Sequence, residues 1–166
     1  MKIYSNYSGN IFVQTAMVAA DLARQNVEVV IMDEAARNEA GFKAKHLTGK
    51  FPLLELENGE LVFESSAICQ HFGRIGGLNG DSAFEAAKVD EWIAFTQCNI
   101  WPATMPVAMA VFGRVETKPE DFTKAVNKLK NHAKTLNNYL DGKHFLAGEK
   151  LSVADVICAC ALIMSF

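Results

Sequence analysis

The sequence lacks the features that mark several large classes of protein. Its 166 residues carry a formal net charge of −3, so charge alone predicts no nucleic-acid surface. The longest apolar stretch, Val153 to Phe166, contains Asp155 and falls short of the ~20 residues that a membrane span needs. No basic stretch followed by an apolar run opens the chain, which predicts no secretory signal. We therefore expect a cytoplasmic location, without direct nucleic-acid or membrane partners.

Cysteine is scarce, and its pattern excludes two further classes. The four cysteines form no CxxC pair, no zinc-binding spacing and no disulfide framework: Cys69, Cys98, Cys158 and Cys160. They predict buried, reduced thiols in a cytosolic protein. We expect no metal site and no tightly bound cofactor.

Strand signals are confined to the first half of the chain. We expect strands at 2–5, 27–32, 53–56 and 61–63, and helices at 11–23, weakly at 38–45, and from Ser65 to Phe72. The nearly continuous apolar run at 27–32 predicts a strand buried on both faces. The order β-α-β-(α)-β-β-α predicts a small mixed sheet with helices on its faces.

The most informative stretch of this half runs from Gly49 to Glu55 and places Pro52 at the entry to a strand. A cis bond at Pro52 would present the backbone of Phe51 as free hydrogen-bonding groups. Because only about 5–6% of X–Pro bonds are cis, the local sequence favours trans. Beyond the strand, Asn58-Gly59 predicts a two-residue type I′ turn, which requires φ > 0 at both positions.

The second half of the chain is predicted to be entirely helical. Four glycines between Gly73 and Gly80 predict a helix end and a linker, so the expected domains are 1–75 and 82–166, joined by 76–81. Capping boxes at Ser82/Glu85 and Thr117/Glu120 predict two helix starts. Pro102 and Pro106 are expected to kink or end the first of these helices, and Gly142 to end the second.

Each of these helices carries an apolar stripe with helical spacing. The residues expected to be buried are Phe84, Ala87, Trp92 and Phe95 in the first, and Phe122, Val126, Leu129, Ala133, Leu136 and Leu140 in the second. Four lysines lie mainly off the second stripe: Lys124, Lys128, Lys130 and Lys134. A basic patch is the alternative, but a solvated helix face explains the lysines better.

The last informative stretch begins at Ser152. Ser152 and Asp155 have the spacing of an N-cap and its N3 partner, and the residues beyond them are nearly all apolar or small. A carboxylate here also suits catalysis, but capping is favoured because a helix N-terminus attracts negative charge. The following helix is expected to run through a core.

These motifs, in this order, resemble the glutathione transferase fold over essentially the whole chain. They are Gly49-Lys50-Phe51-Pro52 before the third strand, Glu64-Ser65 after the fourth, and Gly148-x-x-x-Ser152-x-Ala154-Asp155 at a buried helix. The resemblance implies an α/β thioredoxin-like N-terminal domain, an all-α C-terminal domain and a cis bond at Pro52. The pattern is also similar to the N-terminal domain of the gamma subunit of translation elongation factor 1.

The resemblance implies a glutathione site. The backbone of Phe51 would pair with the cysteinyl unit, as an added strand does. Glu64 and Ser65 match the γ-glutamyl site, where the helix N-terminus suits the carboxylate and Glu64 suits the ammonium. Lys50 would meet the glycyl carboxylate. The alternative for Ser65 is a plain N-cap.

Catalysis by this fold also needs a hydroxyl that holds the thiol as thiolate. The first loop offers Tyr4, Ser5, Tyr7 and Ser8, of which Ser8 is the first candidate and Tyr7 the second. The helix start Gly9-Asn10-Ile11 departs from the arginine-bearing start of many active transferases.

Two functions therefore remain open at the level of sequence. One is an interaction domain that binds the nucleotide-exchange subunits of the elongation factor complex, with glutathione as a possible ligand. The other is a working glutathione transferase. Both are compatible with a homodimer. Because the chain stops at Phe166 within an apolar helix, we expect a truncated or cleaved domain.

Overall fold

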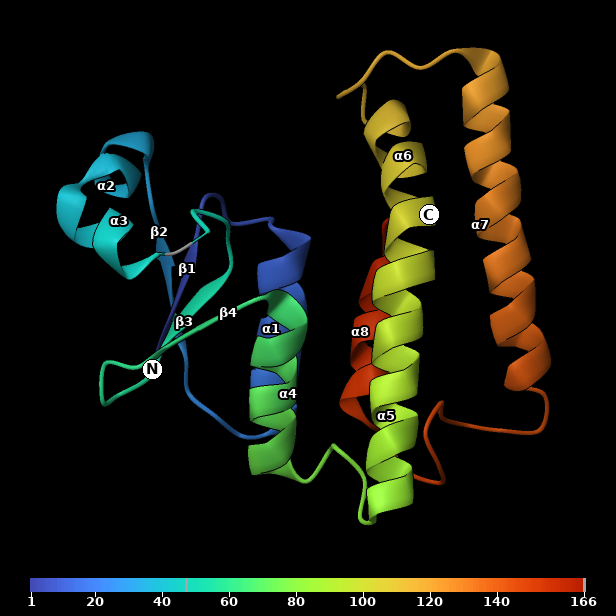
Figure 1. The fold of residues 1–166 in the computed structure, drawn as a ribbon, viewed down its shortest axis with the longest axis horizontal. Helices are drawn as coiled ribbons and strands as arrows, with labels where there is room; N and C mark the ends of the chain where they lie inside the picture. The colour runs from blue at the N-terminus through green and yellow to red at the C-terminus, as the bar shows by residue number, and fades with distance from the viewer. Residues whose placement is uncertain (47, 166) are drawn as a thin grey trace. The chain divides into compact units, whose positions relative to one another are not determined.

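The computed structural model describes residues 1–46 and 48–165, and the chain divides into two compact units, residues 1–78 and 79–166 (Figure 1). The first unit contains β1 (Lys2–Ser5), α1 (Ile11–Leu22), β2 (Glu28–Ile31), α2 (Glu34–Asn38), α3 (Ala40–Lys45), β3 (Leu53–Glu55), β4 (Leu61–Phe63) and α4 (Ser65–Gly76). The strand order is β2-β1-β3-β4, with β2 parallel to β1 and the other pairs antiparallel. The predicted small mixed sheet is confirmed.

Helices α1 and α4 pack side by side on one side of the strands, and α2 and α3 lie on the other (Figure 1). Small residues allow the close approach of α1 and α4. An added Cβ at Gly76 would lie 2.9 Å from the Cα of Ala23, so the contact requires glycine. The central strands bury Ile3 and Leu54 completely, which anchors the strands that carry the site.

Three expectations for this unit are wrong. Strand β2 is an edge strand, so its apolar side chains stay partly in solvent: Val29 is 40% and Ile31 50% exposed. The β3–β4 turn is not type I′, because only Gly59 has a positive φ and its N–H bonds to the Leu56 carbonyl at 3.0 Å. Helix α4 continues beyond the expected end at Phe72 to Gly76, with Gly73 buried inside it.

The second unit is helical, with α5 (Ala83–Phe95), a π-helical segment η1 (Thr96–Ile100), α6 (Trp101–Val111), α7 (Pro119–Tyr139) and α8 (Val153–Ile163). The α-helical pattern breaks at η1, before Pro102, and α6 runs on through Pro106. Helix α5 packs against α8, and α7 packs against α6. No helix of the described ranges is long and apolar enough to cross a membrane.

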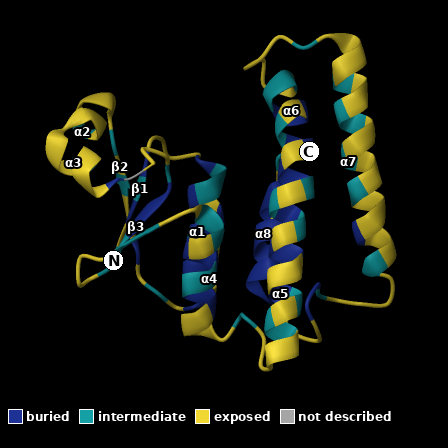
Figure 2. Ribbon diagram, in the orientation of Figure 1, coloured by how far each residue is buried: buried dark blue, intermediate teal, exposed yellow. Residues whose placement is uncertain are grey.

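Figure 2 shows α8 mostly buried, as expected for the helix after Ser152, although Ala159 and Ile163 are exposed. Phe166, where the predicted apolar run ends, lies outside the described residues. Ser152 and Asp155 form the predicted capping box: the Asp155 carboxylate accepts from the Ser152 N–H at 2.9 Å and from the Leu146 N–H at 2.8 Å. Both carboxylate oxygens of Asp155 are therefore used in structural hydrogen bonds, to the start of α8 and to the loop at Leu146.

The other predicted helix starts and buried stripes agree less well with the structure. Ser82 caps α5 as predicted by accepting from the Glu85 N–H at 3.2 Å, but Lys118, not Thr117, is the N-cap of α7. Phe84 is 75% exposed and so does not belong to the buried stripe of α5. Only Leu136 of the α7 stripe is fully buried. The four lysines of α7 are exposed.

Candidate functional site

The turn that leads into β3 contains a cis peptide bond between Phe51 and Pro52. This agrees with the family resemblance and overturns the trans bond that the local sequence favours. Pro52 is buried and Phe51 is half-buried. Within the described ranges, neither backbone group of Phe51 has a hydrogen-bond partner. An extended peptide can therefore pair with Phe51 as an added strand does.

The side chain of Phe51 is held by three residues of the α2–α3 segment. Its ring stacks on Phe42 with centroids 6.0 Å apart and meets the His46 ring edge-on at 5.6 Å. The Arg37 guanidinium lies 5.3 Å from the Phe51 ring centroid, a cation–π distance. The unpaired backbone of Phe51 thus belongs to a residue whose ring is fixed by side chains of α2, α3 and the residue after α3.

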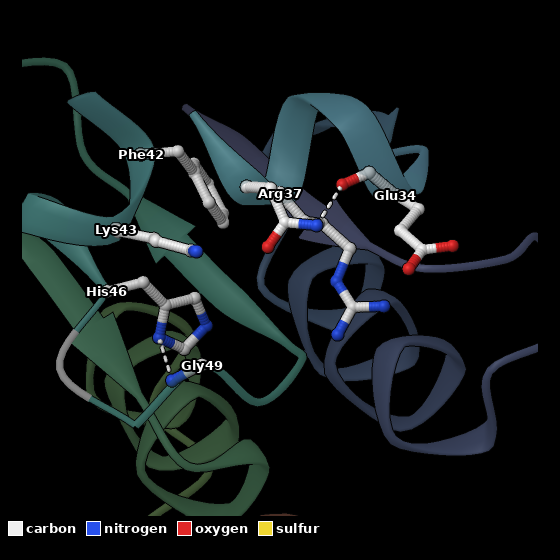
Figure 3. Close-up of a pocket in the computed structure, with 7 residues that line it drawn as sticks. Glu34, Arg37, Phe42, Lys43, His46 and Gly49 are labelled. Atoms are coloured by element: carbon white, nitrogen blue, oxygen red, sulfur yellow. Dashed lines mark hydrogen bonds between the residues drawn. The ribbon is translucent and has the colours of Figure 1, made fainter. Parts of the chain in front are cut away.

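A pocket of about 250 Å³ lies beside this cluster, between α2, α3 and the turn (Figure 3). It is lined by Glu34, Arg37, Asn38, Phe42, Lys43, His46 and Gly49. Figure 3 shows the Lys43 amine and the His46 ring on one side of this space and the Arg37 guanidinium on the other. Its size suits the end of a peptide rather than a whole drug-sized molecule.

The charges of the pocket favour an anion. Arg37 and Lys43 supply two cationic groups against the single carboxylate of Glu34. Neither cation forms an ion pair with a described residue. Arginine and lysine without carboxylate partners are available to bind a carboxylate or a phosphate.

His46 adds a buried donor to the same pocket. It is 5% exposed, and its Nδ1 accepts from the Gly49 N–H at 3.0 Å. A nitrogen that accepts carries no proton, so the ring proton of the neutral imidazole sits on Nε2. This Nε2 is buried and has no partner in the part of the chain that the structure describes. A buried unpaired N–H costs free energy, which a ligand acceptor would recover.

The N-terminus of α4 is the second half of the site. Glu64, not Ser65, is its N-cap, so the plain N-cap expected as the alternative for Ser65 is wrong; Ser65 is the first helical residue. Glu64 adopts φ 68°, which L-residues rarely adopt, and its side chain makes no capping bond. The first N–H groups of α4 are therefore open to an anion.

One predicted site residue lies apart from the pocket, and three residues that line it were not predicted. Lys50 is exposed and does not line the pocket. The pocket cations Arg37 and Lys43 and the donor His46 were missed by the sequence analysis. The only signal for them was a polar, weakly helical stretch directly before the Gly-Lys-Phe-Pro motif, which does not indicate where the side chains point.

The four hydroxyls of the first loop differ in whether they are already hydrogen-bonded. Tyr4 donates to the Glu55 carboxylate at 2.6 Å, and buried Ser5 donates to the Tyr7 carbonyl at 2.7 Å, so both are engaged. Tyr7 is 52% exposed and Ser8 is exposed, both just before the Asn10 N-cap of α1. Ser8 and Tyr7 thus remain the predicted catalytic candidates. The described residues contain no cluster of three His, Cys, Asp or Glu side chains suited to a metal ion.

Comparison with known proteins places these features in a family. Residues 1–74 match the family described as glutathione S-transferase, N-terminal domain, and residues 100–166 match its C-terminal domain. Among curated proteins, the glutathione S-transferase-like protein LUC7 of a Fusarium species is 30% identical over 90% of this chain and 71% of its own length.

Two further relatives carry another name. The probable elongation factor 1-gamma 1 of Arabidopsis thaliana is 28% identical over 99% of this chain. The elongation factor 1-gamma of Trypanosoma cruzi is 32% identical over 88% of it. The chain spans only 41% and 36% of the lengths of these two relatives.

Solved structures agree on the fold. A glutathione S-transferase I bound with lactoylglutathione superposes with a TM-score of 0.87 at 23% identity, over 98% of this chain and 81% of that one. A glutathione S-transferase from Pseudomonas fluorescens gives 0.85 at 22% identity, over 99% and 83%. These likenesses establish the architecture alone.

Proposed function

The chain belongs to the glutathione S-transferase family, and we propose that it is a glutathione-binding interaction domain of the elongation factor 1-gamma type. In this role it would bind nucleotide-exchange subunits of the elongation factor complex in the cytoplasm and support protein synthesis. Three relatives named elongation factor 1-gamma or probable elongation factor 1-gamma align with 98–99% of this chain, which supports the narrower assignment.

One observation carries the glutathione half of the proposal: the unpaired backbone of Phe51 lies beside a cationic pocket with a buried, unpaired N–H. The cysteinyl unit would pair with the Phe51 backbone. The glycyl carboxylate would enter the pocket, between Arg37 and Lys43 and within reach of the His46 Nε2–H. Lys50, which is exposed, remains a candidate to contact the same carboxylate from the solvent side.

The γ-glutamyl end would bind at α4. Its α-carboxylate would accept hydrogen bonds from the open N–H groups and from the Ser65 hydroxyl, where the helix dipole favours negative charge. Its ammonium would lie against the Glu64 carboxylate. The two ends of the tripeptide would thus each meet opposite charge, one in the pocket beside Phe51 and the other at the start of α4.

The same structure supports binding more strongly than turnover. A thiolate at neutral pH needs an oriented donor or a positive neighbour. The first turn of α1 supplies no arginine, and no described hydrogen bond orients the Ser8 or Tyr7 hydroxyl. A domain with these features is expected to bind glutathione and to conjugate it slowly.

Calorimetric titration with glutathione tests the site. We expect saturable binding that is weakened at least tenfold in the Ser65→Ala, Arg37→Ala double variant, because two anchoring charge interactions are lost together. Absence of binding by the unmodified chain would overturn the glutathione site. The interaction role is tested separately by co-purification with an exchange-factor subunit, and a stoichiometric complex is expected.

An active transferase is the second candidate, favoured by the exposure of the Ser8 and Tyr7 hydroxyls directly before α1. It predicts measurable conjugation of glutathione to an aryl halide, lost in Ser8→Ala or Tyr7→Phe with glutathione binding retained. Turnover that neither substitution affects would exclude both residues as the thiolate donor. Sedimentation analysis of the same samples tests the expected homodimer.

A further inference from the structure

We propose that Tyr4 and Glu55 are positioning residues that fix α3 on the sheet and thereby set the affinity of the α2–α3 pocket for the glycyl end of a thiol peptide. This inference rests on the proposed glutathione site. Neither residue touches the pocket, and the sequence analysis gave Tyr4 only as one hydroxyl of the first loop.

The first link is a hydrogen bond between adjacent strands. In the β1–β3 pair, Tyr4 lies opposite Leu53, so Glu55 is its diagonal neighbour on the same face of the sheet. The Tyr4 hydroxyl donates to Glu55 Oε2 at 2.6 Å. This face is the one toward α3, because the Tyr4 ring packs edge-on against Phe42 with centroids 5.5 Å apart.

The second link reaches α3 itself. Lys45, the last residue of α3, places its Nζ 3.4 Å from Glu55 Oε1. Glu55 thus receives a donor from the sheet through one oxygen and a cation from α3 through the other. The side chain of Glu55 is only 21% exposed and its bond to Tyr4 is partly buried, so solvent weakens that bond less than a bond at the surface; the Lys45 side chain is 54% exposed, and its contact is the weaker one. We call Tyr4, Glu55 and Lys45 the latch.

The third link connects the latch to the pocket through aromatic contacts. Phe42, which contacts Tyr4, also stacks on Phe51 and meets the His46 ring at 5.6 Å. Phe42 and His46 line the pocket, and Phe51 supplies the backbone beside it. A displacement of α3 therefore moves a wall of the pocket and the buried donor together.

The latch matters because α2 and α3 have little to hold them. They contain five and six residues, and none of these is fully buried. Helices this short are unstable in isolation. Their placement therefore depends on tertiary contacts, of which the latch and the aromatic cluster are the polar and apolar parts. If the latch is broken, α3 can move, and the distances between Arg37, Lys43 and His46 should no longer be fixed.

The pKa shifts agree with a permanent bond between a neutral phenol and an ionised carboxylate. The hydrogen bond to Glu55 raises the pKa of Tyr4 to about 12, and the same bond lowers the pKa of Glu55. The raised pKa of Tyr4 and the lowered pKa of Glu55 thus keep the Tyr4–Glu55 bond in one protonation state throughout the neutral range.

Two peptides separate a positioning role from general stabilisation. Glutathione carries the glycyl carboxylate, whereas γ-glutamylcysteine lacks the glycyl unit and so does not reach the pocket. In Tyr4→Phe we expect glutathione affinity to fall about tenfold, or about 1.4 kcal/mol, and γ-glutamylcysteine affinity to change less than about twofold. Glu55→Ala should give the same pattern. Both affinities are measured by calorimetry on the full chain.

Tyr139→Phe is the matched control. Tyr139 also donates its hydroxyl, to the Leu146 carbonyl at 2.9 Å, but in the second unit. Its loss should leave both affinities unchanged. Hydrogen exchange without ligand supplies a second readout: amides of residues 34–46 should exchange faster in Tyr4→Phe and not in Tyr139→Phe.

Each outcome decides. Equal weakening of both peptides, or of neither, overturns the positioning role while the glutathione site stands. Unchanged exchange at residues 34–46 overturns the latch itself, whatever the peptides do. If the unmodified chain binds neither peptide, the proposed site fails and with it the effect on affinity.

Discussion

Two helix N-termini in this protein begin with a serine and an acidic residue close together, and they are used in opposite ways. At α8, Ser152 and Asp155 satisfy each other, and Asp155 also accepts from the buried Leu146 N–H. At α4, neither Glu64 nor Ser65 caps the helix through its side chain. The first end is closed by its own chain, and the second is left open.

The difference teaches that composition at a helix start does not decide its role. A satisfied cap contributes to stability and has nothing left to offer a ligand. An unsatisfied end costs stability and keeps its N–H groups available to an anion. The unusual φ of Glu64 belongs to the same pattern, since strain is kept where a site requires a particular geometry.

The largest effect is expected for Asp155→Ala, which removes the cap of α8. The free energy of unfolding should fall by about 3 kcal/mol or more, because a hydrogen bond to a charged group contributes about 1.5–3 kcal/mol and the Leu146 N–H is left buried and unpaired. Urea unfolding measures this. Asp141→Ala removes an exposed carboxylate without a described partner and should change stability by less than about 0.5 kcal/mol.

Glu64→Gly tests the open end. Relief of a left-handed conformation, about 1–2 kcal/mol, exceeds the extra chain entropy of glycine, about 0.5–1 kcal/mol, so stability should rise by about 0.7 kcal/mol. Glutathione affinity should nevertheless fall about tenfold, because the carboxylate for the ammonium is lost.

Arg24 provides the control for Glu64, because it is the other described non-glycine residue with positive φ, at 56°. Arg24→Gly should raise stability by a similar amount and leave glutathione affinity unchanged. Thermal unfolding and calorimetry together measure both effects. If Glu64→Gly gained stability and kept its affinity, the open end would have no role in binding.

His46→Asn sharpens the comparison at the pocket. Asparagine keeps an acceptor for the Gly49 N–H and removes the buried Nε2–H. Glutathione affinity should fall about tenfold, since the lost hydrogen bond is to the glycyl carboxylate and a hydrogen bond to a charged group contributes about 1.5 kcal/mol or more. His144→Asn, at an exposed position, is expected to have no effect. An unchanged affinity in His46→Asn would show that the buried N–H does not meet the ligand.

The last prediction concerns the pH dependence of the bond between Tyr4 and Glu55. The folded pKa of Tyr4 is raised to about 12, so its contribution is complete below the unfolded value near 10 and lost as pH rises through 12. The folded pKa of Glu55 is lowered, so its contribution is present above its unfolded value and lost as pH falls through the folded one.

Phenolate absorbance as a function of pH measures the tyrosine part directly. One of the three tyrosines should titrate near pH 12, and this step should disappear in Tyr4→Phe. If the step persisted in that variant, the late titration would belong to another residue and the bond to Glu55 would have no measurable effect.

Local rules account for the parts of the fold that sequence analysis obtained correctly. β1 was predicted at its observed bounds, and the caps at Ser82 and Ser152 were found from spacing alone. The same rules failed where a neighbour outside the segment decides burial. The apolar run of β2 predicted a strand buried on both faces, but β2 lies at the edge of the sheet, where Val29 and Ile31 stay partly exposed.

The sequence by itself determined the order of the elements, the Phe51-Pro52 motif and the closed end of α8, because these depend on residues a few positions apart. Only the tertiary structure decided the pocket and the latch. Tyr4 and Glu55 are 51 residues apart, and Arg37, Lys43 and His46 converge only once α2 and α3 lie against the sheet. Convergence of side chains from separate short elements depends on long-range packing, which no local pattern encodes.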